Sequence, residues 1–377
     1  MSENNTNIPK LRFPGFTEAW EQRRLGELAD IVRGASPRPI QDPKWFDENS
    51  DVGWLRIADV TEQDGRIHHL EQRISELGQE KTRVLTDPHL LLSIAATVGK
   101  PVVNYIKTGV HDGFLIFLNP KFDREFMFQW LEMFRPMWQK YGQPGSQVNL
   151  NSDLVKNQVI MLPTEEEQKE IGGFFSQLDN LITLHQRKLK HLHDKKKSLL
   201  QKMFPKNGSN VPEIRFPGFT DAWEQRKLGD MVEFFNGKRI PIDSEKRIHG
   251  KYPYYGATGI IDYVEDYIFE GEYVLLAEDG ANITTRNSPI AYLPEGKFWI
   301  NNHAHIMRMM CGSNYFLLQL LEKQNYEKYN TGTAQPKLNA KVVKNMTLNF
   351  PFKKEQEKIG EFFKELDNTI TLHQRKS

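Results

Sequence analysis

The sequence predicts an α+β fold. Two mixed α/β domains are joined by two long helices that form an antiparallel coiled coil, and a pseudo-two-fold internal repeat relates the halves. Residues 12–26, RFPGFTEAWEQRRLG, recur as residues 215–229, RFPGFTDAWEQRKLG, with thirteen of fifteen positions identical. Residues 171–188, IGGFFSQLDNLITLHQRK, recur as residues 359–376, IGEFFKELDNTITLHQRK. Repeats at such a spacing indicate a duplicated structural unit. We call residues 12–26 and 215–229 the frame segments.

The segments between the repeats barely resemble each other, and short apolar runs in them predict strands. The clearest runs are FLIFLN at 114–119, YVLLAEDG at 273–280 and HIMRMM at 305–310. Apolar residues at helical spacing in 125–138 and 315–329 predict helices that pack on these strands. Each half therefore combines a shared frame and helix with a variable α+β domain.

The first long helix has a clear start and stop. Thr164 followed three residues later by Glu167 predicts a capping box, and Pro205 predicts an end near Phe204. The second helix follows Pro351, with Phe352 in the capping position.

Apolar residues at alternating three- and four-residue spacing predict that the two helices bury each other. The first helix contributes Ile171, Phe174, Leu178, Ile182, Leu189, Leu192, Leu199 and Met203, with His185 and Lys196 as polar interruptions; the second contributes Ile359, Phe362, Leu366 and Ile370. The short link between the first helix and the second frame segment predicts that the helices run antiparallel, with the variable domains at opposite ends. A generic helical hairpin between two domains remains an alternative.

Five segments follow from these boundaries. They are 1–163, the first variable domain with its frame segment; 164–205, the first long helix; 206–212, a linker; 213–351, the second variable domain with its frame segment; and 352–377, the second long helix. Ser377 aligns with Leu189, so the second helix lacks about fifteen residues of the first. We expect either that the protein has an unequal pair of helices or that the second helix is truncated in this sequence.

Composition is that of a soluble protein with ordinary cores. The 377 residues are 38% hydrophobic and 26% charged, with a formal net charge of +1 and a single cysteine, Cys311. No apolar run reaches the roughly 18 residues of a membrane span, and the first ten residues lack the apolar core of a signal peptide. We therefore expect a cytoplasmic protein without a membrane partner.

Several motifs resemble those of the specificity subunit of type I DNA restriction–modification systems, and the resemblance covers essentially the whole chain. The motifs are GFTEAWEQRRLGELADIVRG with its echo GFTDAWEQRKLGDMVEFFNG, the helix starts LPTEEEQKEIGGFF and FPFKKEQEKIGEFF, and the strand-like VHDGFLIF and NNHAHIM. The resemblance implies two target recognition domains, each recognising one half of an asymmetric bipartite site in double-stranded DNA. It also implies that the helix pair sets the length of the unspecified spacer.

The resemblance further implies partner subunits. Two adenine-methyltransferase subunits would dock on the repeated helices and frame segments, and motor–nuclease subunits would join them. S-adenosylmethionine, ATP and Mg would then be bound by those partners, and this chain would bind no cofactor. The location implied is the bacterial or archaeal cytoplasm, in association with the nucleoid through DNA.

The chain carries no recognisable catalytic motif. It has no Pro-Pro pair of the kind found in adenine methyltransferases, no Walker-type phosphate loop, and no HExxH or CxxC. We therefore expect no catalytic residue and no metal site, with His303 and His305 in core and hydrogen-bonding roles. A catalytic enzyme acting alone is one alternative. A two-headed protein-binding scaffold without DNA specificity is the other.

Loop residues with Lys, Arg, Ser, Thr, Asn, Gln or Tyr side chains are the candidates for DNA contact, because these groups bind phosphates and base edges. In the first half they are Arg33, Ser36, Arg38, Lys100, Gln143, Ser146 and Gln147; in the second they are Lys238, Arg239, Tyr255, Thr258, Asn282, Arg286, Thr333, Gln335 and Lys337.

Aromatic residues of the repeats are the candidates for the partner interface that the resemblance implies. They are Phe16, Trp20, Phe174 and Phe175, and in the second half Phe219, Trp223, Phe362 and Phe363. For Trp20 and Trp223 we favour a buried anchor between frame segment and helix over a platform for base stacking.

Overall fold

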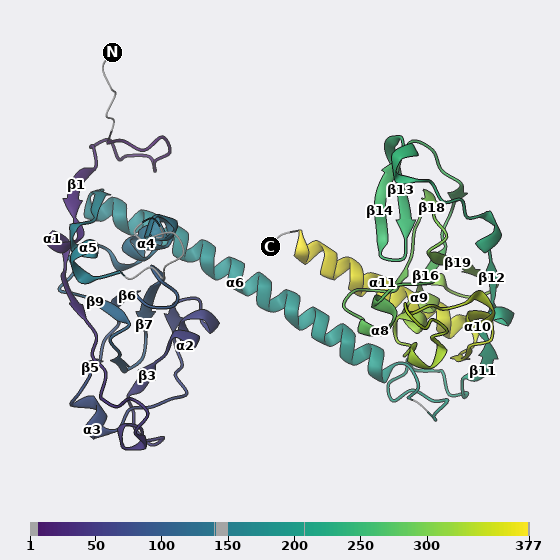
Figure 1. The fold of residues 1–377 in the computed structure, drawn as a ribbon, viewed down its shortest axis with the longest axis horizontal. Coiled ribbons are helices and arrows are strands. Elements are labelled where there is room, and N and C mark those ends of the chain that lie inside the picture. The colour runs from purple at the N-terminus through teal and green to yellow at the C-terminus, as the bar shows by residue number, and fades with distance from the viewer. Residues whose placement is uncertain (1–6, 139, 141–149, 207, 376–377) are drawn as a thin grey trace, which may run out of the picture. The chain divides into compact units, whose positions relative to one another are not determined.

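The computed structural model describes residues 7–138, 140, 150–206 and 208–375 (Figure 1). It divides into two compact units, Met1–Leu181 and Ile182–Ser377, each with mixed helices and strands. This confirms the predicted fold class. Of the helices in the described part of the chain, none is both long and apolar enough to cross a membrane.

Unit 1 is built on a five-stranded sheet of order β2-β9-β6-β7-β4 and a three-stranded sheet of order β3-β8-β5. The strands are β1 (Glu21–Arg24), β2 (Asp30–Arg33), β3 (Gly53–Leu55), β4 (Arg66–Ile67), β5 (Arg83–Leu85), β6 (Leu90–Ser93), β7 (Pro101–Asn104), β8 (Thr108–Val110), β9 (Phe114–Leu118) and β10 (Val159–Leu162). The helices are α1 (Leu25–Leu28), η1 (Pro43–Trp45), α2 (Ile57–Glu62), α3 (Glu76–Gln79), α4 (Arg124–Trp138) and α5 (Ser152–Asn157). The predicted strand at 114–119 and helix at 125–138 are confirmed as β9 and α4.

Unit 2 contains two four-stranded sheets, of order β12-β19-β16-β17 and β14-β13-β18-β15. Its strands are β11 (Glu224–Lys227), β12 (Val232–Phe234), β13 (His249–Gly256), β14 (Gly259–Val264), β15 (Phe269–Glu270), β16 (Val274–Ala277), β17 (Ala291–Tyr292), β18 (Lys297–Ile300), β19 (Ala304–Met309) and β20 (Thr347–Phe350). Its helices are α7 (Leu228–Met231), η3 (Asn236–Lys238), η4 (Ser244–Lys246), α8 (Asn282–Thr285), α9 (Asn314–Glu322), η5 (Glu327–Tyr329), α10 (Ala340–Lys344) and α11 (Lys353–Gln374). The strands predicted at 273–280 and 305–310 are confirmed as β16 and β19.

The helix predicted over 315–329 is shorter than expected. Helix α9 ends at Glu322, and the chain then turns so that Tyr326 is buried with its hydroxyl donating to the carbonyl of Leu321 at 2.9 Å. The chain leaves the helix so that this aromatic ring can be buried. The periodicity of apolar residues alone does not predict this turn.

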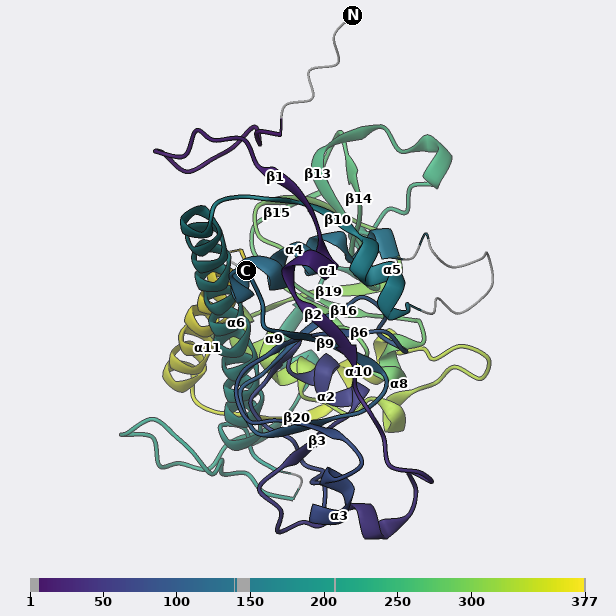
Figure 2. The ribbon, with the colours of Figure 1, turned by 90° about the vertical axis from the view of Figure 1, so that its left-hand side faces the viewer.

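Helix α6 (Glu165–Lys202) begins where the sequence predicts and ends two residues before Phe204. In unit 2, its last part packs against α11, as the views in Figures 1 and 2 both show. The ring centroids of His185 and His373 lie 6.2 Å apart, while Lys196 lies 2.7 Å from Asp367. A higher number on one helix therefore meets a lower number on the other, which confirms the predicted antiparallel contact within this unit.

The two sets of repeats, which are out of step in the sequence, meet in the same small structure in each unit. The frame strand β1 pairs antiparallel with β10, the strand that leads into α6, and β11 pairs in the same way with β20, the strand that leads into α11. The frame segment and the helix start are thus one packed element, although more than a hundred residues separate them. This explains why both parts are duplicated while the intervening segments differ.

A buried ion pair fixes each frame segment to its helix. The guanidinium of Arg12 donates to both carboxylate oxygens of Glu167 at 2.6 and 2.7 Å, and Arg215 donates to Glu355 at 2.7 and 2.8 Å. The predicted capping box is therefore only half present. The amide of Glu167 bonds the hydroxyl of Thr164 at 3.4 Å, but its carboxylate binds Arg12 and the indole of Trp20. A cation held beside the carboxylate is a stronger partner than one backbone amide.

Removing the arginine of this pair is expected to destabilise unit 2. In Arg215→Ala, the carboxylate of Glu355, 1% exposed, stays buried without its cation. The free energy of unfolding should fall by about 2–3 kcal/mol, with part of it recovered in the double variant with Glu355→Gln. Urea denaturation measures this, with Arg226→Ala, an exposed arginine of the same frame segment, as control. Equal losses in the two arginine variants would contradict a structural role for the pair.

Candidate nucleic-acid interface and docking surface

In unit 1, three of the predicted DNA-contacting residues gather around one carboxylate. Asp112, which precedes β9, accepts from the hydroxyl of Ser36 at 2.9 Å and from the guanidinium of Arg38 at 2.5 Å. Arg33 donates to the backbone carbonyl of Asp112 at 2.6 Å. Burial raises the pKa of Asp112, but Ser36 and the two arginines outweigh this and hold its pKa below the usual value. The carboxylate thus stays ionised and binds the guanidinium of Arg38, which is 71% exposed, while the backbone carbonyl of the same residue binds Arg33.

The other candidates of unit 1 are not part of this cluster. The ammonium group of Lys100 lies 2.6 Å from Asp64 and 3.2 Å from Glu132, and its side chain is 12% exposed. Its charge is therefore balanced within the protein. Gln143, Ser146 and Gln147 lie outside the described residues.

In unit 2, Glu278 plays the role that Asp112 plays in unit 1. Its carboxylate lies 2.7 Å from the guanidinium of Arg239 and 3.8 Å from the ammonium of Lys337. Arg239 also donates to three backbone carbonyls and is nearly buried, so it holds the loop together. Lys238 and Lys337 are exposed beside it. These loops thus combine one nearly buried arginine with two exposed lysines.

The remaining candidates of unit 2 divide into loop-holding and exposed side chains. Asn282 bonds the backbone of Ser288 and Pro289, and Arg286 binds Glu322 at 3.0 Å. Tyr255 lies half-buried against Phe298. The exposed side chains are Thr258, Thr333 and Gln335.

Next to the Glu278 cluster, His305 is fully buried and fully bonded. Its Nε2 lies 2.7 Å from the carbonyl of Leu338, and its Nδ1 lies 2.9 Å from the amide nitrogen of Asn236. The Asn236 oxygen accepts from the amide of Ile306, so its nitrogen donates to Nδ1. This requires the neutral imidazole with the proton on Nε2. The predicted core and hydrogen-bonding role of His305 is confirmed, while His303 is exposed and lies 2.9 Å from Asp279.

Acidification is expected to weaken unit 2 through this histidine. Burial lowers the pKa of His305, although the carbonyl of Leu338 and the carboxylate of Glu278 oppose the shift. The unfolded chain therefore takes up the proton first, and stability falls as the pH drops below the ordinary histidine value of about 6.5. Thermal melting between pH 7.5 and 5.5 measures this. The variant His305→Gln should be less stable at pH 7.5 and less sensitive to pH; an unchanged pH dependence would contradict the assignment.

The predicted partner-interface residues differ in exposure between the units. Phe13 packs edge-on against Phe174 in unit 1, and Phe216 packs in the same way against Phe362 in unit 2, both at 5.7 Å. Trp223 and Phe363 are 2% and 0% exposed. The interpretation of the repeated tryptophan as a buried anchor is confirmed for Trp223, whereas Trp20 is half-buried. Phe16 and Phe219 are half-buried on their frame segments.

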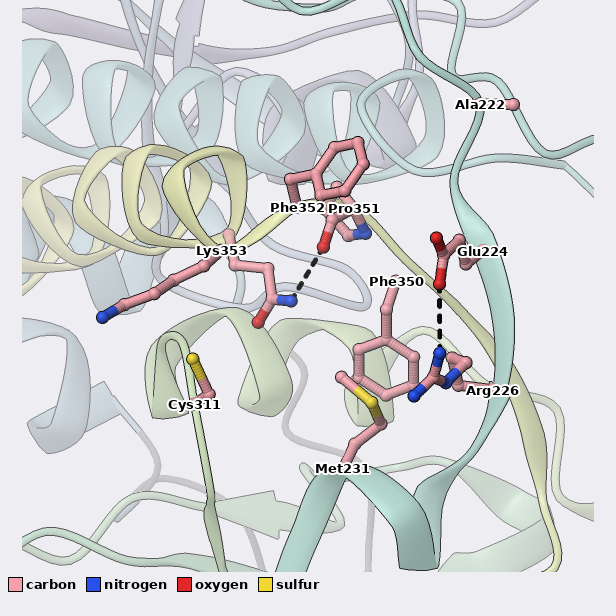
Figure 3. Close-up of a pocket in the computed structure, with 10 residues that line it drawn as sticks. Ala222, Glu224, Arg226, Met231, Cys311, Phe350, Pro351, Phe352 and Lys353 are labelled. Atoms are coloured by element: carbon pink, nitrogen blue, oxygen red, sulfur yellow. Dashed lines mark hydrogen bonds and ion pairs between the residues drawn. The ribbon is translucent and has the colours of Figure 1, made fainter.

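A shallow pocket lies between the frame strand and the start of α11 (Figure 3). It measures about 200 Å³ and is lined by Glu224, Arg226, Met231, Cys311 and Phe350–Lys353, among others. The amide of Gln356 donates to the carbonyl of Pro351 at 2.8 Å, and Gln168 makes the same bond to Pro163 in unit 1. The wall of the pocket formed by the start of α11 is therefore built in the same way as the start of α6. Among the described residues, no group of three or more His, Cys, Asp or Glu is placed to hold a metal ion.

Sequence reasoning missed both organising carboxylates. Asp112 lies in the segment VHDGFLIF, and Glu278 follows the strand β16. Each residue lies next to the end of an apolar strand. In the folded protein it lies close to basic loop residues that are far from it in the sequence. A conspicuous acidic residue at a strand end was the only local signal.

Two unlike sheet domains on a duplicated frame, each with a loop cluster of cations, define a two-domain recognition protein. The family model described as the type I restriction modification DNA specificity domain matches residues 17–194 and again residues 220–377. The chain belongs to this family. The family match gives no support to a protein-binding scaffold.

Individual relatives and one solved structure agree with this assignment. A putative type I restriction enzyme specificity subunit of Haemophilus influenzae is 36% identical over 147 residues, which covers 39% of this chain and 37% of the relative. The type I restriction enzyme MjaVIII specificity subunit of Methanocaldococcus jannaschii is 22% identical over 99% of this chain and 91% of its own length. The crystal structure of the S subunit of a type I restriction–modification system from M. genitalium shares the fold, with a TM-score of 0.66 at 14% identity over 98% of this chain and 94% of its own.

Proposed function

We propose that this chain is the DNA-specificity subunit of a type I restriction–modification complex and that each unit recognises one half of an asymmetric bipartite site. The observation that carries the proposal is the duplicated frame with unlike domains. The frame hairpin, the Arg–Glu pair and the helix start are the same in both units, whereas the sheets differ in strand number and order. A shared frame is suited to binding two copies of the same partner. Different domains are suited to recognising different DNA sequences.

The cation clusters are the proposed contacts with DNA. Lys238, Lys337 and the exposed guanidinium of Arg38 are suited to phosphate oxygens, because they keep charge at the surface. Thr258, Thr333 and Gln335 are exposed polar side chains that can bond base edges. Asp112 pairs with Arg38, and Glu278 pairs with Arg239 and Lys337, which limits the net charge of each cluster.

The repeated aromatic surface is the proposed dock for two methyltransferase subunits. Phe13 with Phe174, and Phe216 with Phe362, place equivalent aromatic pairs on both units. S-adenosylmethionine, ATP and Mg would be bound by the methyltransferase and motor–nuclease partners. This chain would supply specificity and no catalytic group. Helix α6 with α11 would set the spacer between the half-sites.

Salt dependence of DNA binding tests the proposed phosphate contacts. For the complex of this chain with its methyltransferase, Lys238→Ala should weaken binding to all DNA sequences by a similar factor. The slope of log K against log salt should become shallower by about 0.9, because one fewer counterion is released. Lys190→Ala, an exposed lysine on α6, is the control. An unchanged slope in the Lys238 variant would remove it from the interface, and indifference of the complex to both half-sites would overturn the proposed function.

A further inference from the structure

The two variable domains share a short pattern, although their sequences otherwise barely resemble each other. It lies at the start of α4 in unit 1 and of α9 in unit 2, and it reads DREFMFQ at 123–129 and SNYFLLQ at 313–319. Both copies have the form cap-x-x-Phe-x-x-Gln. The side chain of the cap accepts from the amide of the Phe, at 2.9 Å for Asp123 and at 3.2 Å for Ser313. We call residues 123–129 and 313–319 the attachment segments.

The Phe of each attachment segment packs on the tryptophan of the frame segment. The rings of Phe126 and Trp20 meet edge-on with their centroids 6.3 Å apart, and those of Phe316 and Trp223 meet edge-on at 5.7 Å. Both Phe rings are buried. Since the two tryptophans occupy the same position of the frame repeat, this contact joins a residue of the variable domain to a repeated residue in both units.

The first turn of each attachment segment rests on a glycine of the long helix. A Cβ on Gly172 would lie 2.6 Å from the amide nitrogen of Phe126, and a Cβ on Gly360 would lie 3.2 Å from the amide nitrogen of Phe316. The two glycines are equivalent in the helix repeat. The backbone of the variable domain therefore touches the backbone of the long helix at the same position in both units.

The Gln of each attachment segment reaches an aspartate of the repeated sequence LDN. The side-chain amide of Gln129 donates to the carboxylate of Asp179 at 2.6 Å, and that of Gln319 donates to Asp367 at 3.5 Å. The hydroxyl of Tyr315, which is also in the attachment segment, donates to the same oxygen of Asp367 at 2.6 Å. The repeated aspartate thus accepts from the attachment segment in both units.

The cation beside this aspartate differs between the units. The guanidinium of Arg66 on β4 lies 3.5 Å from Asp179, whereas the ammonium of Lys196 on α6 lies 2.7 Å from Asp367. The contact from the attachment segment is therefore the shared one. Gly172 and Asp179 are seven residues apart, which places them on one face of α6 at a separation of about 10.5 Å. Two contacts at that separation fix where the domain lies along the helix and how it is rotated on it.

We propose that the cap-x-x-Phe-x-x-Gln pattern is the means by which both recognition domains are attached to the long helices, and that the bond from its Gln to the repeated aspartate selects the length of the gap between the half-sites. The inference rests on the proposed function, because the placement of a domain on its helix then determines where its half-site lies along the DNA. Neighbouring base pairs are about 3.4 Å apart, so a domain held at both points of contact accepts one gap length. Gln129 and Gln319 are positioning residues that act through Asp179 and Asp367.

Gly172→Ala and Gly173→Ala form a matched pair that tests the backbone contact. Both variants add one methyl group to α6, but a Cβ on Gly173 has no neighbouring atom within 4 Å, and Glu361 is its counterpart in the helix repeat. The full chain is expressed with its methyltransferase, and methylated adenines are mapped in cells. Gly172→Ala should extend methylation to sites whose gap is one base pair longer or shorter, with both half-sites unchanged. Gly173→Ala should keep the gap of the unaltered chain, and equal gap selection by the two variants would overturn the proposal.

Gln129→Glu tests the bond to the aspartate, because it places a second carboxylate beside Asp179. The preference for the original gap over gaps one base pair longer or shorter should fall about tenfold, the factor that corresponds to the loss of one hydrogen bond to a charged group. The double variant with Asp179→Asn restores a donor and an acceptor in the reverse direction and should regain the preference. The preference is a ratio measured within one cell, so a lower amount of folded chain does not alter it.

The outcomes separate this inference from the proposed function. If the unaltered complex requires both half-sites but Gln129→Glu reduces methylation by the same factor at every gap length, or leaves it unchanged, the attachment contact has no role in gap selection and the inference alone is overturned. A change in the bases of either half-site in this variant would also overturn it, since Gln129 would then act on recognition itself. An unaltered complex that methylates DNA without regard to both half-sites would overturn the proposed function and this inference with it.

Discussion

Deletion of residues 189–195 from α6 is expected to shorten the unspecified gap in the recognised DNA by about three base pairs and to leave both half-sites unchanged. Seven residues of α-helix correspond to about 10.5 Å at 1.5 Å per residue, and a base pair rises about 3.4 Å. The expectation rests on the proposal that α6 with α11 sets the spacer. The half-sites should stay the same because the cation clusters around Asp112 and Glu278 are untouched.

Seven residues are chosen to keep the phase of the helix pair. Two turns of helix are removed, so Ile182 and His185 take the positions of Leu189 and Leu192 on the same face. The contacts of Lys196 with Asp367 and of Phe204 with its ring partners lie beyond the deletion and are retained. A deletion of two residues would rotate the face by about 200° and is the control expected to abolish methylation. Mapping of methylated adenines in cells measures the length of the gap. An unaltered gap after the seven-residue deletion would contradict the proposal that α6 with α11 sets the spacer.

The largest effect on stability is expected from Phe204→Ala. The ring is 1% exposed among Phe316, Trp223 and Phe363, so its removal leaves a cavity that these large rings cannot close. The free energy of unfolding of unit 2 should fall by about 3–5 kcal/mol. Denaturant titration followed by tryptophan fluorescence measures the loss.

Phe175→Ala in unit 1 is the matched comparison. Phe175 corresponds to Phe363 by the helix repeat, but its ring is 42% exposed beside a groove of about 440 Å³. Its replacement should change stability by less than about 1 kcal/mol. Similar losses for Phe204→Ala and Phe175→Ala would contradict the difference in burial between the two rings.

Local sequence signals predicted several helices and strands of this molecule well. Thr164 and Pro163 mark the start of α6, and strands β9, β16 and β19 stand where apolar runs end at Asn or Gly. The duplicated seam predicted the packing of α11 on α6 in unit 2. Such signals succeed because helix caps and strand runs depend on neighbouring residues.

Contacts between distant segments could not be predicted in the same way. Glu167 has the sequence position of a capping glutamate, yet its carboxylate binds Arg12, 155 positions away. The recurrence of this pair as Arg215 and Glu355 was the available clue. Arg239 and Arg286 resemble DNA-binding residues in sequence, but Glu278 and Glu322 hold them in their loops. Only the fold shows which cation already has a carboxylate partner.

The most direct test of the account is to replace residues 230–337 with a copy of residues 27–149, leaving both frame segments and both helices in place. If each variable domain independently recognises one half-site, the pattern of methylated adenines in cells that carry this chain and its methyltransferase should become symmetric. The half-site of the first domain would then appear twice, in inverted orientation, around the gap. A methylated site that keeps its asymmetric second half, or one in which the first half also changes, would contradict independent recognition by two domains on a common frame.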